Sequence, residues 1–255
     1  MKSTTRRALA LLLGAFLLVV VTTIDQRANA GDYSLTATSA FKTSYVLSPG
    51  VEPEHRAVSQ SDITGCTGRF CLNLWVGQTV RQPGNNNESS GNEVDITPSY
   101  STSLGKLGVY AEYAYYARLK RGGSDLHSAL VRFSYPLPDG FGVYLKGQAV
   151  EPTKNGGDLP NGGTLLFFGL TNGFDVGRRL HLGFTVEGVR DDGVAGDEVG
   201  WVGRYAFSPS INFGTWSLDL GAQHYHQWTV TDRGNHTVWS AGVTWRIKSP
   251  KPVEG

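Results

Sequence analysis

Several kinds of residue are scarce in this 255-residue chain. It has two cysteines, one methionine and 18% charged side chains, and its formal net charge is +1. After the first few residues no run of lysine and arginine supplies the positive field that binds nucleic acid, so no nucleic-acid partner is expected. Low charge combined with 11% aromatic residues and 33 glycines is not typical of a disordered chain or of a helical cytosolic enzyme. The composition favours a protein of many strands and turns.

The first 30 residues differ from the rest of the chain. Basic side chains among the first seven positions precede an apolar run from 8 to 21, and Ala28-Asn29-Ala30 follows. About 14 apolar residues are fewer than the roughly 20 that a helix needs to cross a bilayer, and a small-x-small sequence after them is typical of a secretory signal. We predict that residues 1–30 are a cleaved signal peptide. Its removal takes away four of 23 basic and one of 22 acidic residues, which leaves 19 and 21 and a net charge of −2.

The two cysteines, Cys66 and Cys71, are five residues apart. In an exported chain this spacing favours a local disulfide over a metal site, because a metal site needs more ligands. Neither a metal nor another cofactor is predicted. Helical membrane spans are not predicted after residue 30, since no run there approaches 18 apolar residues.

From Tyr33 onward, hydrophobicity alternates with the period of two that is typical of β-strands. Between 107 and 117 the odd positions are apolar while the positions between them are small, polar or charged, and the same pattern recurs near 180–187 and 239–248. We predict an all-β chain of about twelve strands, with ten as the alternative because 54–65 alternates weakly and 162–174 is apolar on both faces. The predicted strands are 33–47, 54–65, 70–82, 93–103, 107–118, 125–135, 141–151, 162–174, 179–190, 200–212, 215–229 and 236–247.

The connections between these strands alternate between short and long. Short turns at 104–106, 136–140, 175–178 and 212–214 are interspersed with longer links rich in glycine, asparagine or charged residues, at 83–92, 119–124, 152–161, 191–199 and 231–235. An up-and-down barrel with one tight rim and one elaborated rim shows this alternation, as outer-membrane barrels do. We predict one up-and-down antiparallel transmembrane β-barrel over residues 31–248, followed by a short periplasmic tail at 249–255.

Tryptophan spacing favours a membrane barrel over a soluble periplasmic one. Trp216 and Trp228 share the apolar face of one predicted strand, twelve residues apart. At about 3.3 Å per residue and a tilt near 45° they span roughly 28 Å, close to the apolar band of about 25 Å between aromatic girdles. The opposite face of that strand is too polar for the dry interior of a small soluble barrel. We predict an aromatic girdle of Trp216, Trp228, Trp239 and Trp245 in contact with outer-membrane lipid and lipopolysaccharide.

Charged residues of both signs occupy the alternate positions, and these positions line the interior if the apolar faces meet lipid. The predicted lumen-lining residues are Lys42, Asp95, Glu112, Arg132, Lys146, Glu187, Arg204, Asp219 and Arg246. Such charges are costly when buried without water or partners, so they indicate either a hydrated lumen or a salt-bridge network that plugs it. The first alternative is a passive channel for small polar or ionic solutes. The second is a closed structural or adhesion barrel.

His224 and His226 are the strongest candidates for chemistry. They lie two residues apart on one strand face, a spacing that suits a metal ion or an enzyme that modifies lipid or lipopolysaccharide. That face is the apolar one, close to Trp228, where an interfacial histidine is ordinary. The chain has no G-x-S-x-G or H-E-x-x-H motif and no glycine loop for phosphate. We therefore do not predict an enzyme, and the lipid-modifying enzyme stays as the alternative.

Several segments of the first half of the chain resemble the TorF-like porin family of Gram-negative outer membranes. The segments are Thr43-Ser44-Tyr45-Val46, Ala57-Val58-Ser59-Gln60-Ser61-Asp62, Glu93-Val94-Asp95-Ile96, Ser99-Tyr100-Ser101, Gly108-Val109-Tyr110 and Tyr115-Tyr116. The Cys66 and Cys71 pair departs from that family. The resemblance implies a porin-like role with no defined substrate. With Trp245 and Ile247 near its end, the chain is expected to be recognised by the barrel-assembly machinery.

Overall fold

The structure, a computed structural model, describes residues 33–47, 51–54, 56–80, 92–118, 125–153, 162–194, 199–229 and 234–248. The predicted signal peptide at 1–30 and the predicted tail at 249–255 lie outside the described residues. Within the ranges that are described, no helix has the length and apolar character to cross a membrane.

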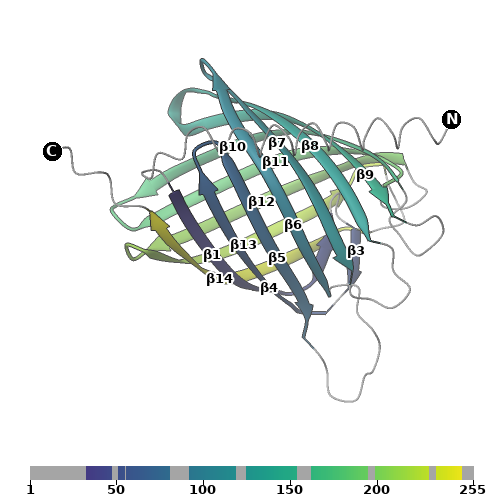
Figure 1. The fold of residues 1–255 in the computed structure, drawn as a ribbon, viewed down its shortest axis with the longest axis horizontal. Helices are drawn as coiled ribbons and strands as arrows, with labels where there is room; N and C mark the ends of the chain where they lie inside the picture. The colour runs from purple at the N-terminus through teal and green to yellow at the C-terminus, as the bar shows by residue number, and fades with distance from the viewer. Residues whose placement is uncertain are drawn as a thin grey trace.

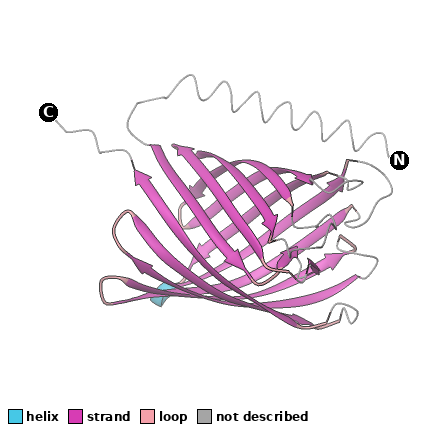
Figure 2. Ribbon diagram, turned by 90° about the horizontal axis from the view of Figure 1, so that it is seen from below, coloured by secondary structure: helices cyan, strands magenta, loops and turns pink. Residues whose placement is uncertain are grey.

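Twelve strands close into one antiparallel barrel, which confirms the predicted count of twelve over ten. They are β1 (Tyr33–Lys42), β4 (Val58–Thr67), β5 (Phe70–Thr79), β6 (Glu93–Leu104), β7 (Leu107–Arg118), β8 (Leu126–Pro136), β9 (Phe141–Pro152), β10 (Gly163–Val176), β11 (Leu180–Asp192), β12 (Val199–Asn212), β13 (Trp216–Gln227) and β14 (His236–Lys248). Each wall strand pairs with the next one along the chain, and β1 pairs with β14 to close the ring (Figure 1). Figure 2 shows the tilted strands curving round into this closed wall.

The first two strand predictions are wrong at their boundaries. The wall strand β1 ends at Lys42, and the residues after it form a separate two-stranded sheet of β2 (Tyr45–Leu47) and β3 (Val51–Glu54). The next wall strand then begins at Val58 instead of residue 54. The physical reason is a tertiary contact, because Val46 packs against buried side chains of three distant strands, β12, β13 and β14. The alternation after residue 42 therefore belongs to this hairpin and not to the wall.

Short and long connections alternate around the barrel, as the sequence predicts. The tight rim joins β4 to β5, β6 to β7, β8 to β9 through the 3₁₀ turn η1 (Pro138–Gly140), β10 to β11, and β12 to β13. Every one of these turns contains a glycine with φ between 57° and 87°, the left-handed region that glycine adopts without steric cost. These are Gly68, Gly105, Gly140, Gly177 and Gly214. The opposite end of the wall carries the longer connections and is called the long-loop rim.

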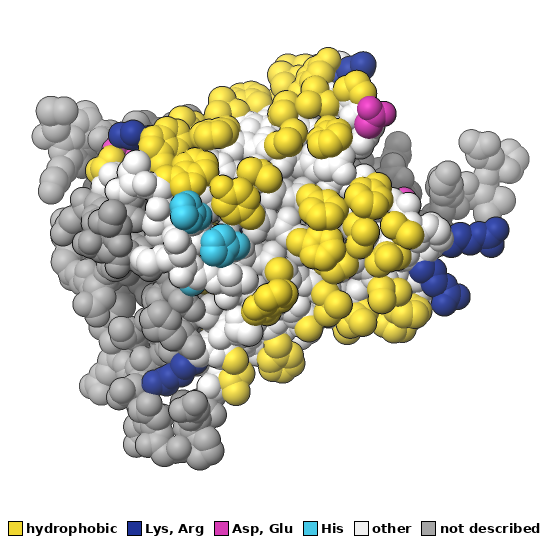
Figure 3. Space-filling view, turned by 180° about the vertical axis from the view of Figure 1, so that it is seen from behind, with side chains coloured by type: hydrophobic (Ala, Val, Ile, Leu, Met, Phe, Trp, Pro, Cys, Tyr) yellow, Lys and Arg dark blue, Asp and Glu magenta, His cyan; other side chains and the backbone are white. Residues whose placement is uncertain are grey.

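The wall strands direct their apolar residues outward. In β10, Leu166, Phe168 and Leu170 are exposed, whereas Leu165 and Phe167, at the alternate positions, are buried inside the barrel. The other wall strands follow the same parity, and Figure 3 shows apolar side chains spread over the outer surface. An apolar exterior around an interior that carries polar and charged side chains is the arrangement of a transmembrane barrel, because a soluble barrel turns its apolar rows inward.

Candidate channel lumen

The nine charged residues predicted to line the lumen lie on the face of their strands opposite to the exposed apolar rows. They are Lys42, Asp95, Glu112, Arg132, Lys146, Glu187, Arg204, Asp219 and Arg246. Within a strand, successive side chains point to opposite faces, so a position of this parity points into the barrel. The structure does not gather all nine in one place. Most of them divide among a packed side, a cavity side and a small group near the tight rim, and Lys42 lies apart near the opposite end of the wall.

Glu187 is the centre of an ion-pair network on the wall formed by β9–β12. Its side chain is buried, and its Oε1 lies 3.0 Å from Nε of Arg204, the residue paired with it across β11 and β12. Nζ of Lys146 lies 4.0 Å from Oε2, and the hydroxyl of Tyr144 donates a hydrogen bond to the same oxygen. One carboxylate thus faces two cations, which offsets much of the cost of placing these charges inside the barrel.

Gly169 makes this network possible. It lies in β10 between Tyr144 of β9 and Glu187 of β11, and it is the cross-strand partner of both. A Cβ at Gly169 would lie 2.2 Å from the ring of Tyr144, so any side chain there would collide with that ring. The bare backbone lets the tyrosine cross β10 and reach the carboxylate.

An apolar cluster closes the same side of the interior toward the long-loop rim. It consists of Val150, Leu165, Phe167, Val189 and Val194, all buried, with Tyr144 packed against it. The cluster touches the ion-pair network directly, since Nζ of Lys146 lies 3.4 Å from the centroid of the Phe167 ring. The buried carboxylate of Asp191 accepts a hydrogen bond of 2.8 Å from the backbone N–H of Val194, which holds that residue in the cluster. We call the inward faces of β9–β12 the packed side.

A second apolar cluster extends this packing around the wall. Val202, Tyr225 and Val238 come from β12, β13 and β14, and Val46 of the β2–β3 hairpin packs against them. Together the two clusters line the interior along these strands, near the long-loop rim, with buried apolar side chains.

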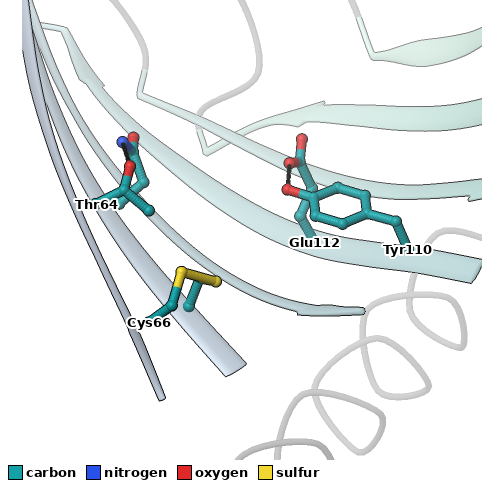
Figure 4. The surroundings of a disulfide bond; sticks show 6 residues. Thr64, Cys66, Tyr110 and Glu112 are labelled. Carbon is teal, nitrogen blue, oxygen red and sulfur yellow. Dashed lines mark hydrogen bonds between the residues drawn. A yellow bond between two sulfur atoms is a disulfide. The ribbon is translucent and has the colours of Figure 1, made fainter. Parts of the chain in front are cut away.

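The inward faces of β4–β7 surround a cavity of about 440 Å³, and we call this the cavity side. Its lining includes Asn73, Trp75, Asp95, Tyr110, Glu112 and Tyr116. Asn73 donates hydrogen bonds of 2.7 Å to Thr64 and 3.3 Å to Asp62, and Tyr110 donates one to Glu112. Thr64, Tyr110 and Glu112 all line the cavity, and Figure 4 shows them with the hydrogen bond between Tyr110 and Glu112 as a dashed line. The cavity is therefore both acidic and aromatic.

Cys66 and Cys71 form a disulfide between β4 and β5, as their spacing predicts. They face each other across the two strands with their Cα atoms 4.1 Å apart, and Cys71 lines the cavity (Figure 4). The disulfide ties the hairpin that forms one edge of the cavity side.

The remaining predicted charges lie apart from both groups or at their margins. Asp219, near the tight rim, accepts hydrogen bonds of 2.6 Å from Ser210 and 3.0 Å from Ser217. Arg246 donates to the same Ser217 hydroxyl, at 3.0 Å. The guanidinium carbon of Arg132 lies 5.2 Å from the Tyr110 ring centroid, so this cation borders the cavity. Lys42 ends β1 near the long-loop rim, paired with Ser240.

Several inward carboxylates were missing from the prediction, among them Glu93, Asp62 and the buried Asp191 of β11. Glu93 lies two residues before Asp95 in β6 and is buried, and Asp62 of β4 accepts the hydrogen bond from Asn73. Both have the strand parity that identifies Asp95. Extending the alternation to the whole of β4 and β6 would have found them, because parity is a local signal.

The outer surface carries the residues predicted for the membrane girdle. Trp216, Trp228, Trp239 and Trp245 all face outward, with 40% to 61% of each side chain exposed. Trp216 and Trp245 are cross-strand partners beside the tight rim, whereas Trp228 lies just beyond the other end of β13, where the long-loop rim begins. Tryptophan at both ends of the apolar rows is typical of the two membrane interfaces.

His224 and His226 also face outward, on the β13 row that contains Trp228. Their ring centroids are 6.4 Å apart, and the Nδ1 atom of His224 is 2.9 Å from the Thr237 hydroxyl. Figure 3 shows histidines on the outer surface among apolar side chains. In the part of the chain that the structure describes, no group of three or more His, Cys, Asp or Glu residues is placed to hold a metal ion.

Comparison with known proteins finds similarity of fold. No protein-family model matches this sequence, and no curated protein matches it. The KdgM porin superimposes with a TM-score of 0.54 at 11% identity, covering 83% of this chain and 98% of that chain. The NanC porin gives 0.57 at 9% identity, covering 84% and 100%, and the translocator domain of the autotransporter NalP from Neisseria meningitidis gives 0.50 at 15%, covering 95% and 98%. The chain therefore shares its barrel fold with outer-membrane porins and a translocator domain.

Proposed function

We propose that this protein is an outer-membrane channel of porin type that lets small polar or ionic solutes diffuse through its lumen. One observation carries the proposal: a closed wall of twelve strands turns apolar rows outward and charged rows of both signs inward, with a cavity of about 440 Å³ on one inner side. Hydrated charges inside an apolar cylinder provide a polar path across a bilayer.

The structural neighbours support the same function. Two of them are named porins, and one KdgM structure is a complex with disordered oligogalacturonate, a polar solute. An outer-membrane location, export by a signal peptide at 1–30, insertion by the barrel-assembly machinery and contact with lipid and lipopolysaccharide belong to this proposal. We also propose, more specifically, that the protein belongs to the TorF-like porin family. The segments quoted from the first half of the sequence support this assignment.

The nine predicted inward charges would set a weak ion selectivity. Lys42, Arg132, Lys146, Arg204 and Arg246 supply positive potential, and Asp95, Glu112, Glu187 and Asp219 oppose it. Because Glu187 already pairs with Arg204 and Lys146, the packed side contributes less field than its formal charges suggest.

Single-channel recording of the refolded protein in a planar bilayer tests the channel. Stable conductance is expected, and quenching of tryptophan fluorescence by lipid-bound quenchers shows whether the protein has inserted. Replacing Arg132 and Lys146 with glutamine should shift selectivity toward cations. The matched control is Arg190→Gln, which removes the same charge from an outward position on β11 beside Trp201.

Two results would contradict the proposal. Inserted protein without conductance would indicate a closed structural or adhesion barrel. Equal selectivity of wild type and the Arg132 and Lys146 variants would show that these cations do not border the ion path.

A further inference from the structure

We propose that the cavity on the β4–β7 side is a binding subsite for small organic cations, such as alkylammonium and guanidinium compounds. The inference rests on the proposed function, because it names the class of solute that the channel binds on its way through. It is carried by the placement of aromatic and acidic side chains around the cavity and by one buried carboxylate oxygen that lacks a partner.

The aromatic walls flank a carboxylate. Across β5, β6 and β7, Trp75 is the cross-strand partner of Asp95, and Asp95 is the partner of Tyr116. All three line the cavity. Direct cross-strand neighbours on one face are about 4.5 to 5.5 Å apart at Cβ, so the carboxylate lies between two aromatic side chains. Aromatic faces attract cations through their quadrupole, and quaternary ammonium groups are recognised by cages of this composition.

Asp95 has an unused hydrogen-bond acceptor. Its side chain is 9% exposed, and Oδ1 is buried without a hydrogen-bond partner among the described residues. A buried acceptor without a donor is costly, and an ammonium or guanidinium ligand supplies both the donor and the opposite charge. The buried Glu93, two residues away on the same face of β6, places a second acidic group beside Asp95, and a bound cation would offset the negative charge of the pair.

A second carboxylate lies toward the tight-rim end of the cavity. Glu112 is paired across strands with Ser99, four residues along β6 from Asp95. Four residues of strand correspond to roughly 13 Å, so the cavity has acidic groups near both ends and suits a linear diamine as well as a single cation.

The surroundings favour an organic cation over a metal ion. In the described part of the chain, no three acidic, histidine or cysteine side chains converge as metal ligands. A hydrated divalent ion gains little from tryptophan and tyrosine, whereas an alkylammonium group gains from both the carboxylate and the aromatic faces.

The test is equilibrium binding of choline and putrescine to the refolded protein in detergent, measured by calorimetry, with glucose and gluconate as neutral and anionic comparisons. Only the cations are expected to bind. Asp95→Asn should weaken binding at least tenfold and Trp75→Leu several-fold. The matched control is Asp192→Asn at the exposed end of β11, which makes the same charge change away from the cavity and should bind like wild type.

Planar-bilayer recording with the same compounds separates this inference from the channel function. Conductance without cation binding would overturn the subsite and leave the channel in place. Cation binding by a barrel that does not conduct would overturn the channel and leave the subsite. Binding that survives both Asp95→Asn and Glu112→Gln would overturn the subsite, and Glu112→Gln provides this test even if the Asp95 variant does not refold.

Discussion

Charged side chains have different surroundings on the packed side and on the cavity side of the interior. On the packed side, Glu187 lies against Arg204 and Lys146, and a buried apolar cluster around Phe167 covers the network. On the cavity side, Asp95 keeps an oxygen without a hydrogen-bond partner among the described residues and faces an open volume. The strands of both sides show the same alternation of outward apolar and inward polar residues. The position of a charged residue in the alternation therefore places its side chain inside the barrel. The cross-strand neighbours of that residue decide whether the charge stabilises the wall or faces a solute.

The largest expected loss of stability follows from removing a buried aromatic ring from the packed side. Phe167→Ala removes a fully buried ring from the cluster and should lower the free energy of unfolding by about 3 to 5 kcal/mol. It should also raise single-channel conductance, because the lost volume adjoins the lumen. Denaturant unfolding in lipid vesicles, followed by tryptophan fluorescence, measures the first effect.

The adjacent residue provides the control for that prediction. Phe168 faces outward and is 47% exposed, so Phe168→Ala removes the same ring without opening a space inside the barrel. Equal losses of stability for the two variants would show that the packed side is no better packed than the membrane-facing surface.

The next effect comes from breaking the ion-pair network. Glu187→Gln keeps the shape but leaves two cations facing each other, and should cost about 2 to 3 kcal/mol of unfolding free energy. That is below the roughly 3 to 5 typical of a fully buried pair, because Arg204 and Lys146 remain 30% and 20% exposed. The same change on the cavity side, Glu112→Gln, should cost less than half as much. A larger loss for the Glu112 variant would reverse the assignment of the two sides.

The fold could be predicted from the sequence because its signals are local. The period of two and the glycine turns depend on neighbouring residues, so strand number, alternating rims and inward parity follow from them. The error after Lys42 arose where a tertiary contact decides, since nothing near Val46 indicates that it packs on Val202, Tyr225 and Val238.

The pairing of charges inside the barrel was beyond a sequence-based prediction. Glu187 meets Arg204 through the register of β11 and β12, which are joined at the long-loop rim, so no tight turn fixes the register in advance. Tyr144 reaches Glu187 only because Gly169 lies between them. The chain has 33 glycines, and nothing in the sequence distinguishes this one from the others. The nine charges could therefore be placed inside, but the division into a packed side and a cavity side needed the register.

The disulfide should matter less than the packed side, although it anchors the cavity side. Replacing Cys66 and Cys71 with serine should lower the unfolding free energy by at most about 2 kcal/mol, because the chain-entropy gain from closing so short a loop is small. Denaturant unfolding with and without reductant measures it, and reduced wild type should match the double variant. A loss as large as that of Phe167→Ala would mean that the cavity side depends on this bond for its structure.

The smallest effect is expected outside both regions. His224 and His226 lie on the outer face of β13, away from the interior network and the cavity, so His224→Gln with His226→Gln should leave conductance unchanged. Surface changes of this kind alter stability by about 0.5 kcal/mol or less. The lipid and lipopolysaccharide profile of cells carrying the double variant tests the remaining alternative, because a channel has no need of these imidazoles. A changed lipid or lipopolysaccharide profile with unaltered conductance would show that these histidines take part in lipid modification on the outer surface, independently of the packed side and the cavity side of the lumen.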